Sequence, residues 1–178
     1  MKDKKSVVLV LDSSIFINNI EILQLNYPLF TINELGQELI SERAKLLFDV
    51  ALINGRLNLI EPSLKSQKYI EKISRKTGDF YNLSKIDRKI LALAWYIKNN
   101  LNFDPIVLTE DYSMQNILSK INIKYTSFVE LGIKSLIHWE FYCPECRTII
   151  KSPNKDFKCP NCGTKIKKRP KTIRRIKK

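Results

Sequence analysis

The four cysteines of this chain all lie within its last 36 residues. They form two Cys-x2-Cys pairs, Cys143 with Cys146 and Cys159 with Cys162, and twelve residues separate the pairs. Each pair presents two thiolates on one side of a tight turn, and this interval lets the two turns close around one tetrahedral ion. The spacing therefore predicts a zinc ribbon. Because four thiolates leave no open coordination position, we expect the zinc to stabilise the fold and to take no part in catalysis.

Two other interpretations of the cysteines are weaker. Unrelated buried cysteines would not repeat one spacing with a proline, Pro144 or Pro160, after the first cysteine of each pair. A disulfide framework would spread its cysteines along the chain and would follow a secretion signal, which the N-terminal residues do not resemble. No apolar run approaches the roughly 20 residues of a membrane span. We expect a cytoplasmic protein with no membrane partner, whose chemistry lies upstream of the cysteines.

Basic residues are concentrated at the end of the chain. The formal net charge is +13, and nine of the 31 basic residues lie between Lys165 and Lys178, where no acidic residue occurs. Such a block is usually disordered alone and binds polyanions, because each phosphate that it neutralises releases a counterion. The pattern predicts a disordered tail over residues 167–178 that contacts nucleic acid. A solubilising tail without a partner is the alternative.

Strand and helix patterns alternate upstream of the cysteines. Residues 6–11 form a continuous, largely β-branched run, which is typical of a buried parallel strand. Further strands are predicted over residues 57–60, 106–108 and 123–125. Helices are predicted over residues 33–54, 63–76, 84–98, 113–119 and 128–135. Ser84 and Asp87 have the spacing of a capping box, and Gly78 is placed as a C-cap. The alternation predicts an α/β fold with three layers, in which helices cover both faces of a parallel sheet.

Four acidic residues are candidates for one site at the carboxyl edge of this sheet. Asp12 and Asp111 follow predicted strands, Glu38 lies one turn into a predicted helix, and Asp87 lies in the first turn of another. Each has an ordinary structural explanation as a cap, a turn residue or a solvated side chain. Together they would bring four negative charges to one place, which is costly unless cations neutralise them.

Two divalent cations would balance this charge. Such ions prefer oxygen ligands, and a pair about 4 Å apart can promote hydrolysis of a phosphodiester. The only histidine is His138, so a metal-free cleavage that uses two imidazoles as acid and base is excluded. The acids therefore favour a metal-dependent nuclease.

Several segments resemble the successive motifs of a PIN domain. They are VLDSSIFI (residues 10–17), the acid in residues 31–39, TGDFYNLSKIDRKILALA (77–94) and VLTEDYSMQN (107–116). A PIN domain followed by a zinc ribbon and a basic tail is similar to the archaeal Nob-family endoribonuclease. That resemblance implies cleavage of precursor small-subunit (16S-type) rRNA at its 3′ end during ribosome biogenesis. It also implies the pre-small ribosomal subunit as a partner, with an assembly factor as a further one.

The resemblance implies roles for individual residues. Asp12, Glu38, Asp87 and Asp111 align with the catalytic acids. Of these, Asp12, Asp87 and Asp111 would hold Mn²⁺ or Mg²⁺. Ser84 and Thr109 would support the acids through their hydroxyls. Glu34 competes with Glu38, because the two lie one helical turn apart, and we favour Glu38.

The resemblance also divides the chain. A nuclease domain is expected over residues 1–135, a ribbon over 136–166 and the tail over 167–178. The ribbon and the tail would bind RNA. The residues expected to do so are Arg147, Lys151, Lys158, Lys167, Lys168 and Arg169. Tyr142 and Phe157 are candidates for stacking on a base, although packing around the zinc explains them equally well.

Three rival functions remain open at this point. A catalytically silent rRNA-binding assembly factor would work through the ribbon and tail alone, and the presence of all four acids speaks against it. A PIN-type toxin ribonuclease would cut tRNA or mRNA, but such toxins generally have no appended ribbon. A transcription-factor-like ribbon would leave the upstream domain without a role.

Overall fold

The chain forms two compact units. The computed structural model describes residues 5–18, 20, 22–127, 135–150 and 157–175. The first unit is Met1–Gly132 and the second is Ile133–Lys178. Within the described parts of the chain, no helix is both long and apolar enough to cross a membrane.

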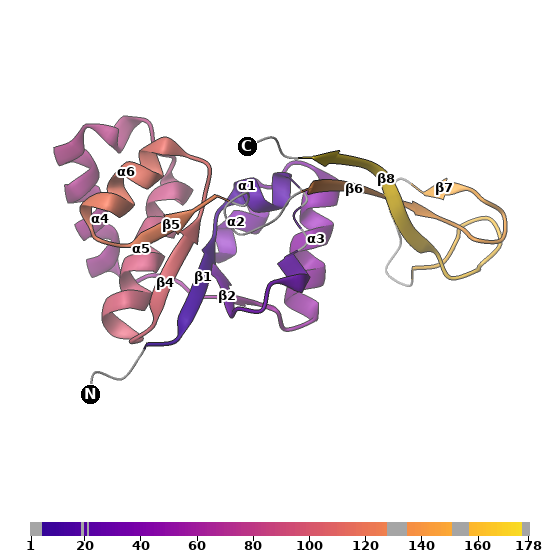
Figure 1. Cartoon of the computed structure of the whole chain (residues 1–178), viewed down its shortest axis with the longest axis horizontal. Helices are drawn as coiled ribbons and strands as arrows, with labels where there is room; N and C mark the ends of the chain where they lie inside the picture. The colour runs from indigo at the N-terminus through magenta and orange to yellow at the C-terminus, as the bar shows by residue number, and fades with distance from the viewer. Residues whose placement is uncertain (1–4, 19, 21, 128–134, 151–156, 176–178) are drawn as a thin grey trace. The chain divides into compact units, whose positions relative to one another are not determined.

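A parallel sheet forms the centre of the first unit (Figure 1). Its described strands have the order β3-β2-β1-β4-β5. They are β1 (Val7–Leu11), β2 (Leu29–Thr31), β3 (Leu57–Leu59), β4 (Asp104–Leu108) and β5 (Lys124–Thr126). The central strand β1 pairs in parallel with β2 and β4, and its residues from Val8 to Leu11 are fully buried. The predicted α/β fold is confirmed. Strand β2 was not predicted from the sequence.

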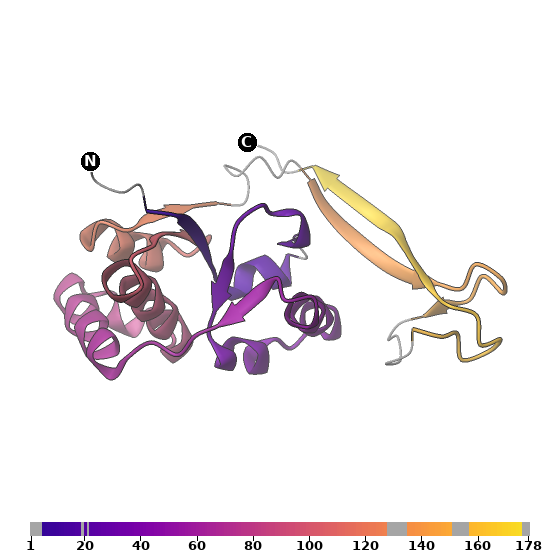
Figure 2. The same ribbon diagram turned by 90° about the horizontal axis from the view of Figure 1, so that it is seen from below.

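Helices cover both faces of this sheet. The helices are α1 (Ser13–Ile17), α2 (Asn33–Glu38), α3 (Glu42–Ile53), α4 (Leu64–Thr77), α5 (Lys85–Asn100) and α6 (Tyr112–Lys120). Two 3₁₀ turns, η1 (Ile22–Gln24) and η2 (Asp79–Tyr81), complete the connections. Helices α1 to α3 lie on one face, and α4 to α6 lie on the other (Figures 1 and 2). This arrangement is the one that right-handed crossovers between parallel strands produce.

The prediction of one long helix over residues 33–54 is wrong. The chain leaves the helical conformation at Leu39, whose ψ is 110°, and a new helix begins after Ser41. The break lets α2 fold back on α3, where Gly36 approaches Phe48 so closely that an added Cβ would lie 2.7 Å from the ring. Tertiary packing therefore overrides the helical propensity of this segment. Of the helix predicted over 128–135, residues 128–134 lie outside the described residues, and Ser135 belongs to a strand.

The predicted helix caps around α4 and α5 are confirmed. Gly78 ends α4 in the left-handed conformation with φ of 84°. Ser84 and Asp87 form a complete capping box, in which each side chain accepts a hydrogen bond from the backbone N–H of the other residue. These caps fix the start of α5, and so the position of Asp87, at the carboxyl edge of the sheet.

The connections that follow two neighbouring strands diverge at this edge. Strands β1 and β4 are neighbours in the sheet, but β1 continues into α1 on one face and β4 continues into α6 on the other. Ligands of open parallel sheets bind where neighbouring connections diverge in this way. Asp12 follows β1 at this point, and Thr109 follows β4.

The second unit contains a small antiparallel sheet. Its described strands have the order β7-β6-β8, with β6 (Ser135–Tyr142), β7 (Ile149–Ile150) and β8 (Lys167–Arg175). The prediction of a disordered tail is wrong for residues 167–175, because β8 pairs with β6 along its whole length. Backbone pairing with β6 orders β8, although a segment of this charge would be unfolded alone. The charge pattern of residues 167–175 does not indicate that they pair with β6.

Candidate active site

Asp12 is a buried carboxylate at the end of the central strand. Only 4% of the residue is exposed. Its Oδ1 accepts the backbone N–H of Ser13 at 2.6 Å, which caps α1, and its Oδ2 accepts the hydroxyls of Ser14 at 3.2 Å and Thr109 at 2.8 Å. Burial raises the pKa of Asp12, although these hydrogen bonds oppose the shift. The Asp12 carboxylate is therefore shielded from water, and its hydrogen bonds fix its orientation.

Thr109 connects Asp12 with Asp111. The fully buried Thr109 hydroxyl donates to Asp12 and accepts the backbone N–H of Asp111 at 3.1 Å. Asp111 caps α6 through its Oδ1, which accepts the N–H groups of Ser113 at 2.6 Å and Met114 at 3.4 Å. The Thr109 hydroxyl thus links the Asp12 carboxylate after β1 to the backbone of Asp111 after β4.

Asp87 and Ser84 meet in the capping box. The Asp87 Oδ2 accepts the backbone N–H of Ser84 at 2.7 Å, and the Ser84 hydroxyl accepts the N–H of Asp87 at 3.1 Å. Asp87 is half-buried. Ser84 and Asp87 therefore cap the N-terminus of α5. The same hydrogen bonds fix the position of the Asp87 carboxylate.

Electrostatic coupling joins Glu38 to the other acids. Partial burial raises the pKa of Glu38, and the negative charges of Asp87 and Asp12 raise it further. The charge of Asp87 also contributes to the raised pKa of Asp12. Three carboxylates therefore repel one another at this edge, and a divalent cation bound among them would relieve the repulsion.

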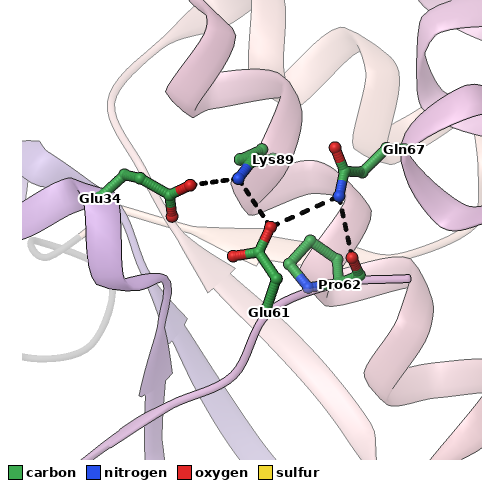
Figure 3. A network of polar contacts seen from close by, with 5 residues as sticks. All are labelled: Glu34, Glu61, Pro62, Gln67 and Lys89. Atoms are coloured by element: carbon green, nitrogen blue, oxygen red, sulfur yellow. Dashed lines mark hydrogen bonds and ion pairs between the residues drawn. The ribbon is translucent and has the colours of Figure 1, made fainter. Parts of the chain in front are cut away.

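Glu34 has a different environment from Glu38. Its carboxylate pairs with Lys89 of α5, whose ammonium group also binds Glu61 at 2.6 Å (Figure 3). The hydrogen bond from Lys89 lowers the pKa of Glu34. Gln67 donates to the Glu61 carboxylate at 3.5 Å and to the carbonyl of Pro62 at 2.9 Å. Glu34 thus has a cationic partner, whereas Glu38 interacts with the acids.

Lys89 is a site-supporting residue that sequence reasoning missed. Its side chain is only 13% exposed, and it ties α2, which carries Glu38, to α5, which carries Asp87. A lysine two residues after a candidate acid, in the first turns of the same helix, was the signal that could have drawn attention to it.

The candidate acids are grouped less closely than the cysteines. Among the described residues, the only group of three or more His, Cys, Asp or Glu side chains whose ligand atoms all lie within 4.8 Å of one another consists of the four cysteines. The carboxylates share one edge of the sheet but are spread more widely. Carboxylate oxygens are suitable ligands for Mg²⁺ and Mn²⁺.

The four cysteines fit a tetrahedral metal ion. The Sγ atoms of Cys143 and Cys162 lie 3.4 Å apart, those of Cys146 and Cys159 lie 3.5 Å apart, and those of Cys146 and Cys162 lie 3.7 Å apart. Thiolates bound tetrahedrally at a metal–sulfur distance of about 2.3 Å lie about 3.8 Å from one another. Cys143 and Cys159 pack in a small core with Ile150 and Ile166.

The two cysteine turns repeat one local structure. In each turn the first cysteine bonds to a threonine backbone, with the N–H of Cys143 donating to Thr148 at 3.0 Å and that of Cys159 donating to Thr164 at 2.8 Å. The threonine hydroxyls lie 3.2 Å from the Cys146 sulfur and 3.4 Å from the Cys162 sulfur. These contacts lower the pKa of both thiols, that of Cys146 to about 6, and so favour the thiolates that a metal requires.

The residues expected to bind RNA are distributed along the second unit. Arg147, Lys158, Lys167 and Arg169 are exposed, and the guanidinium carbon of Arg169 lies 4.7 Å from the centre of the Tyr142 ring. Lys168 lies in β8, and Lys151 falls outside the described residues. The ring of Phe157 packs against Phe141 and the cysteine core, so packing rather than base stacking explains it.

Comparison with known proteins identifies the family. Residues 9–97, which contain Asp12, Glu38 and Asp87, match the family model described as the PIN domain of ribonuclease. Endoribonuclease Nob1 of Methanothermobacter thermautotrophicus is 31% identical over 140 residues, which cover 79% of this chain and 80% of that protein. The chain belongs to the family of PIN-domain endoribonucleases that includes Nob1. As a member of that family it is an endoribonuclease.

Of two further relatives, one is a second Nob1 protein and the other has the name VapC1. Endoribonuclease Nob1 of Pyrococcus abyssi is 29% identical over 138 residues, which cover 78% of each protein. Ribonuclease VapC1 of Thermoplasma acidophilum is 29% identical over 175 residues, which cover 96% of this chain and 84% of that protein. The PIN-domain similarity therefore extends across ribonucleases of both names.

Proposed function

We propose that this endoribonuclease cleaves precursor small-subunit rRNA of the 16S type at its 3′ end, in the cytoplasm, during ribosome biogenesis. The observation that carries the proposal is the presence in one chain of the acidic sheet edge and the four-cysteine centre. Similarity to Nob1 proteins over about four fifths of the chain supports it. The pre-small ribosomal subunit is the proposed partner, and an assembly factor would join it there.

The acids have distinct tasks in this proposal. Asp12, Asp87 and Asp111 hold Mn²⁺ or Mg²⁺, and Glu38 completes the negative site beside them. The divalent ions supply activation of water and charge stabilisation at the phosphate, which leaves 3′-hydroxyl and 5′-phosphate ends. The Thr109 hydroxyl orients the Asp12 carboxylate, and the backbone N–H of Ser84 orients that of Asp87.

The second unit binds substrate in this proposal. Zinc held by the four thiolates stabilises the two cysteine turns, while Arg147, Lys158, Lys167 and Arg169 contact the phosphate backbone. Lys151 and Lys168 are proposed to act with them. Each phosphate contact releases counterions, so the affinity for RNA falls as salt concentration rises.

Replacement of Asp12 by Asn tests the function. Asparagine retains the cap of α1 and removes the charge. With Mn²⁺ present, the wild-type chain should cut an RNA that spans the mature 3′ end of the small-subunit rRNA, and the Asp12→Asn variant should bind that RNA without cutting it. Equal cutting by both proteins, each purified until a mock preparation cuts no RNA, would reject the assigned chemistry. Binding by a wild-type chain that cuts no RNA would instead indicate a silent assembly factor.

Similarity to Ribonuclease VapC1 favours a second candidate function, cleavage of tRNA or mRNA in the manner of a PIN-type toxin. The two functions are separated by substrate. The wild-type chain should cut the pre-rRNA fragment at one mapped position and leave tRNA and mRNA of equal length intact. Faster cutting of tRNA or mRNA would favour the second function.

A further inference from the structure

Two tyrosines of the first unit have almost fully exposed rings. Tyr81 is 88% exposed and Tyr112 is 85% exposed. Single exposed aromatic residues are common on protein surfaces and need no explanation by themselves. These two, however, come from the segments that carry the candidate acids. Tyr112 directly follows Asp111, and Tyr81 lies three residues before Ser84.

A hydrogen bond joins the segments of the two tyrosines. The Asn116 side chain of α6 donates to the Asp79 carboxylate of η2 at 2.6 Å. Asn116 lies one helical turn after Tyr112 and therefore shares its face of α6. Asp79 and Tyr81 are the two ends of η2. The contact consequently places η2 beside the face of α6 on which Tyr112 stands.

Two arginines stack on the ring of Phe80, the residue before Tyr81. The ring of Tyr81 makes an edge contact with Phe80, at 5.4 Å between centroids and 88° between planes. The guanidinium carbons of Arg75 and Arg88 lie 3.6 Å and 4.4 Å from the Phe80 centroid. Arg88 also donates to the Phe80 carbonyl at 3.2 Å, which fixes the turn. A positioned aromatic ring next to cationic groups is the combination that binds single-stranded nucleic acid.

We propose that Tyr81 and Tyr112 stack on unpaired bases of the RNA segment whose phosphate lies at the acidic site. This inference rests on the proposed function, because it requires RNA at that edge of the sheet. Exposed rings stack on a base only where the base is not already stacked in a duplex. The site therefore selects a single-stranded region, and the tyrosines hold the strand while the acids act on it.

Binding measurements without catalysis test this inference. The full chain is titrated with a short fluorescent oligouridylate in Ca²⁺, and each tyrosine is replaced by Ala and, separately, by Phe. Loss of one stacked base at about 1–3 kcal/mol corresponds to binding that is roughly 5- to 150-fold weaker. We expect that loss for Tyr81→Ala and Tyr112→Ala, and nearly wild-type affinity for the Phe variants, which keep the ring. Binding to a duplex of equal length should not change.

Tyr27 provides the matched control. It is 41% exposed and precedes β2, so it lies at the opposite end of the strands from the acids. Tyr27→Ala should leave the affinity unchanged. Photo-crosslinking with 5-iodouridine in the same oligonucleotide should label Tyr81 and Tyr112 and should not label Tyr27.

The outcomes separate this inference from the function on which it rests. If the wild-type chain binds and cuts RNA but the Ala variants bind as tightly and the crosslinks fall elsewhere, the stacking inference is wrong and the proposed function stands. If the wild-type chain does not bind the oligouridylate or the pre-rRNA fragment, both are wrong. If the Ala variants lose duplex binding equally, the tyrosines do not read unpaired bases.

Discussion

The two units of this chain obtain their structure from different sources. The first unit buries a large apolar core around a parallel sheet, and it places its acids at one edge by helix caps and hydroxyl contacts. The core of the second unit, in its described part, consists of Cys143, Ile150, Cys159 and Ile166, with two partly buried phenylalanines against it. A core of that size does not hold a fold alone. We therefore expect the first unit to fold without a metal ion, and the second to depend on the ion that its four thiolates would bind.

Loss of the thiolate centre should have the largest effect on stability. Zinc contributes about 10–16 kcal/mol to the folding of small zinc domains. In the Cys143→Ser variant, we expect the amide resonances of the cysteine turns to collapse to random-coil positions while those of the first unit keep their dispersion. Thr148→Val, which retains all four ligands, is the matched control and should keep its bound zinc. Dispersed ribbon resonances in the serine variant would show that the two units do not differ in this way.

Thr109→Val tests the preformed part of the acidic site. The change removes the hydroxyl that holds Asp12 but retains a similar shape. Loss of such a supporting contact typically lowers metal affinity or activity about 10- to 100-fold. We expect Mn²⁺-dependent cleavage to fall by that factor.

The matched control is Ser74→Ala, which removes a buried hydroxyl that donates to the Ile70 carbonyl of α4 at 2.9 Å. It should lower the free energy of unfolding by about 1 kcal/mol and leave the Mn²⁺ dependence of cleavage unchanged. An equal loss of activity in both variants would mean that general stability, not the position of Asp12, limits the reaction.

Lys89→Met should have a smaller effect, confined to the first unit. It leaves the partly buried Glu34 carboxylate without its cationic partner, and we expect a loss of about 1–2 kcal/mol in the free energy of unfolding, measured by urea denaturation. Lys124→Met breaks an ion pair of 2.9 Å with Asp104, but Lys124 is 67% exposed. Lys124→Met should lower the free energy of unfolding by less than about 0.5 kcal/mol. Similar losses in the two variants would contradict a structural role for Lys89.

The smallest effect concerns pH. Because burial raises the pKa of Asp12, the folded chain binds a proton at a pH where the unfolded chain is still ionised. Stability from this group is therefore present at low pH and is lost as the pH rises through the folded pKa. Without divalent ions, Asp12→Asn should be more stable than the wild type at neutral pH, and the difference should shrink as the pH falls toward the ordinary value of an aspartate. A difference that grows on acidification would have the wrong sign.

The sequence predicted the elements that local patterns determine. The buried run of β1, the capping box at Ser84 and the C-cap at Gly78 depend on residues close together in the chain, and all three are present. The two Cys-x2-Cys pairs are also short local motifs, and they correctly predicted that the four cysteines form one cluster.

Features that depend on distant partners were missed or wrong. The break between α2 and α3 depends on contact of Gly36 with Phe48, and the order of β8 depends on pairing with β6. The link through Lys89 joins residues 34, 61 and 89, which no periodic pattern connects. For the candidate acids, the sequence indicates that they share one edge of the sheet. It does not indicate the distances between their carboxylates.

A crystal structure with Mn²⁺, recorded at the manganese absorption edge, tests the central claim most directly. That claim is that the acids at the carboxyl edge of the sheet hold divalent ions jointly. We predict anomalous density about 2 Å from carboxylate oxygens of Asp12 and Asp111, with Asp87 and Glu38 facing the same ions, and its loss in Asp12→Asn. Manganese bound elsewhere in the wild-type crystal, with no density between β1 and β4, would contradict the account.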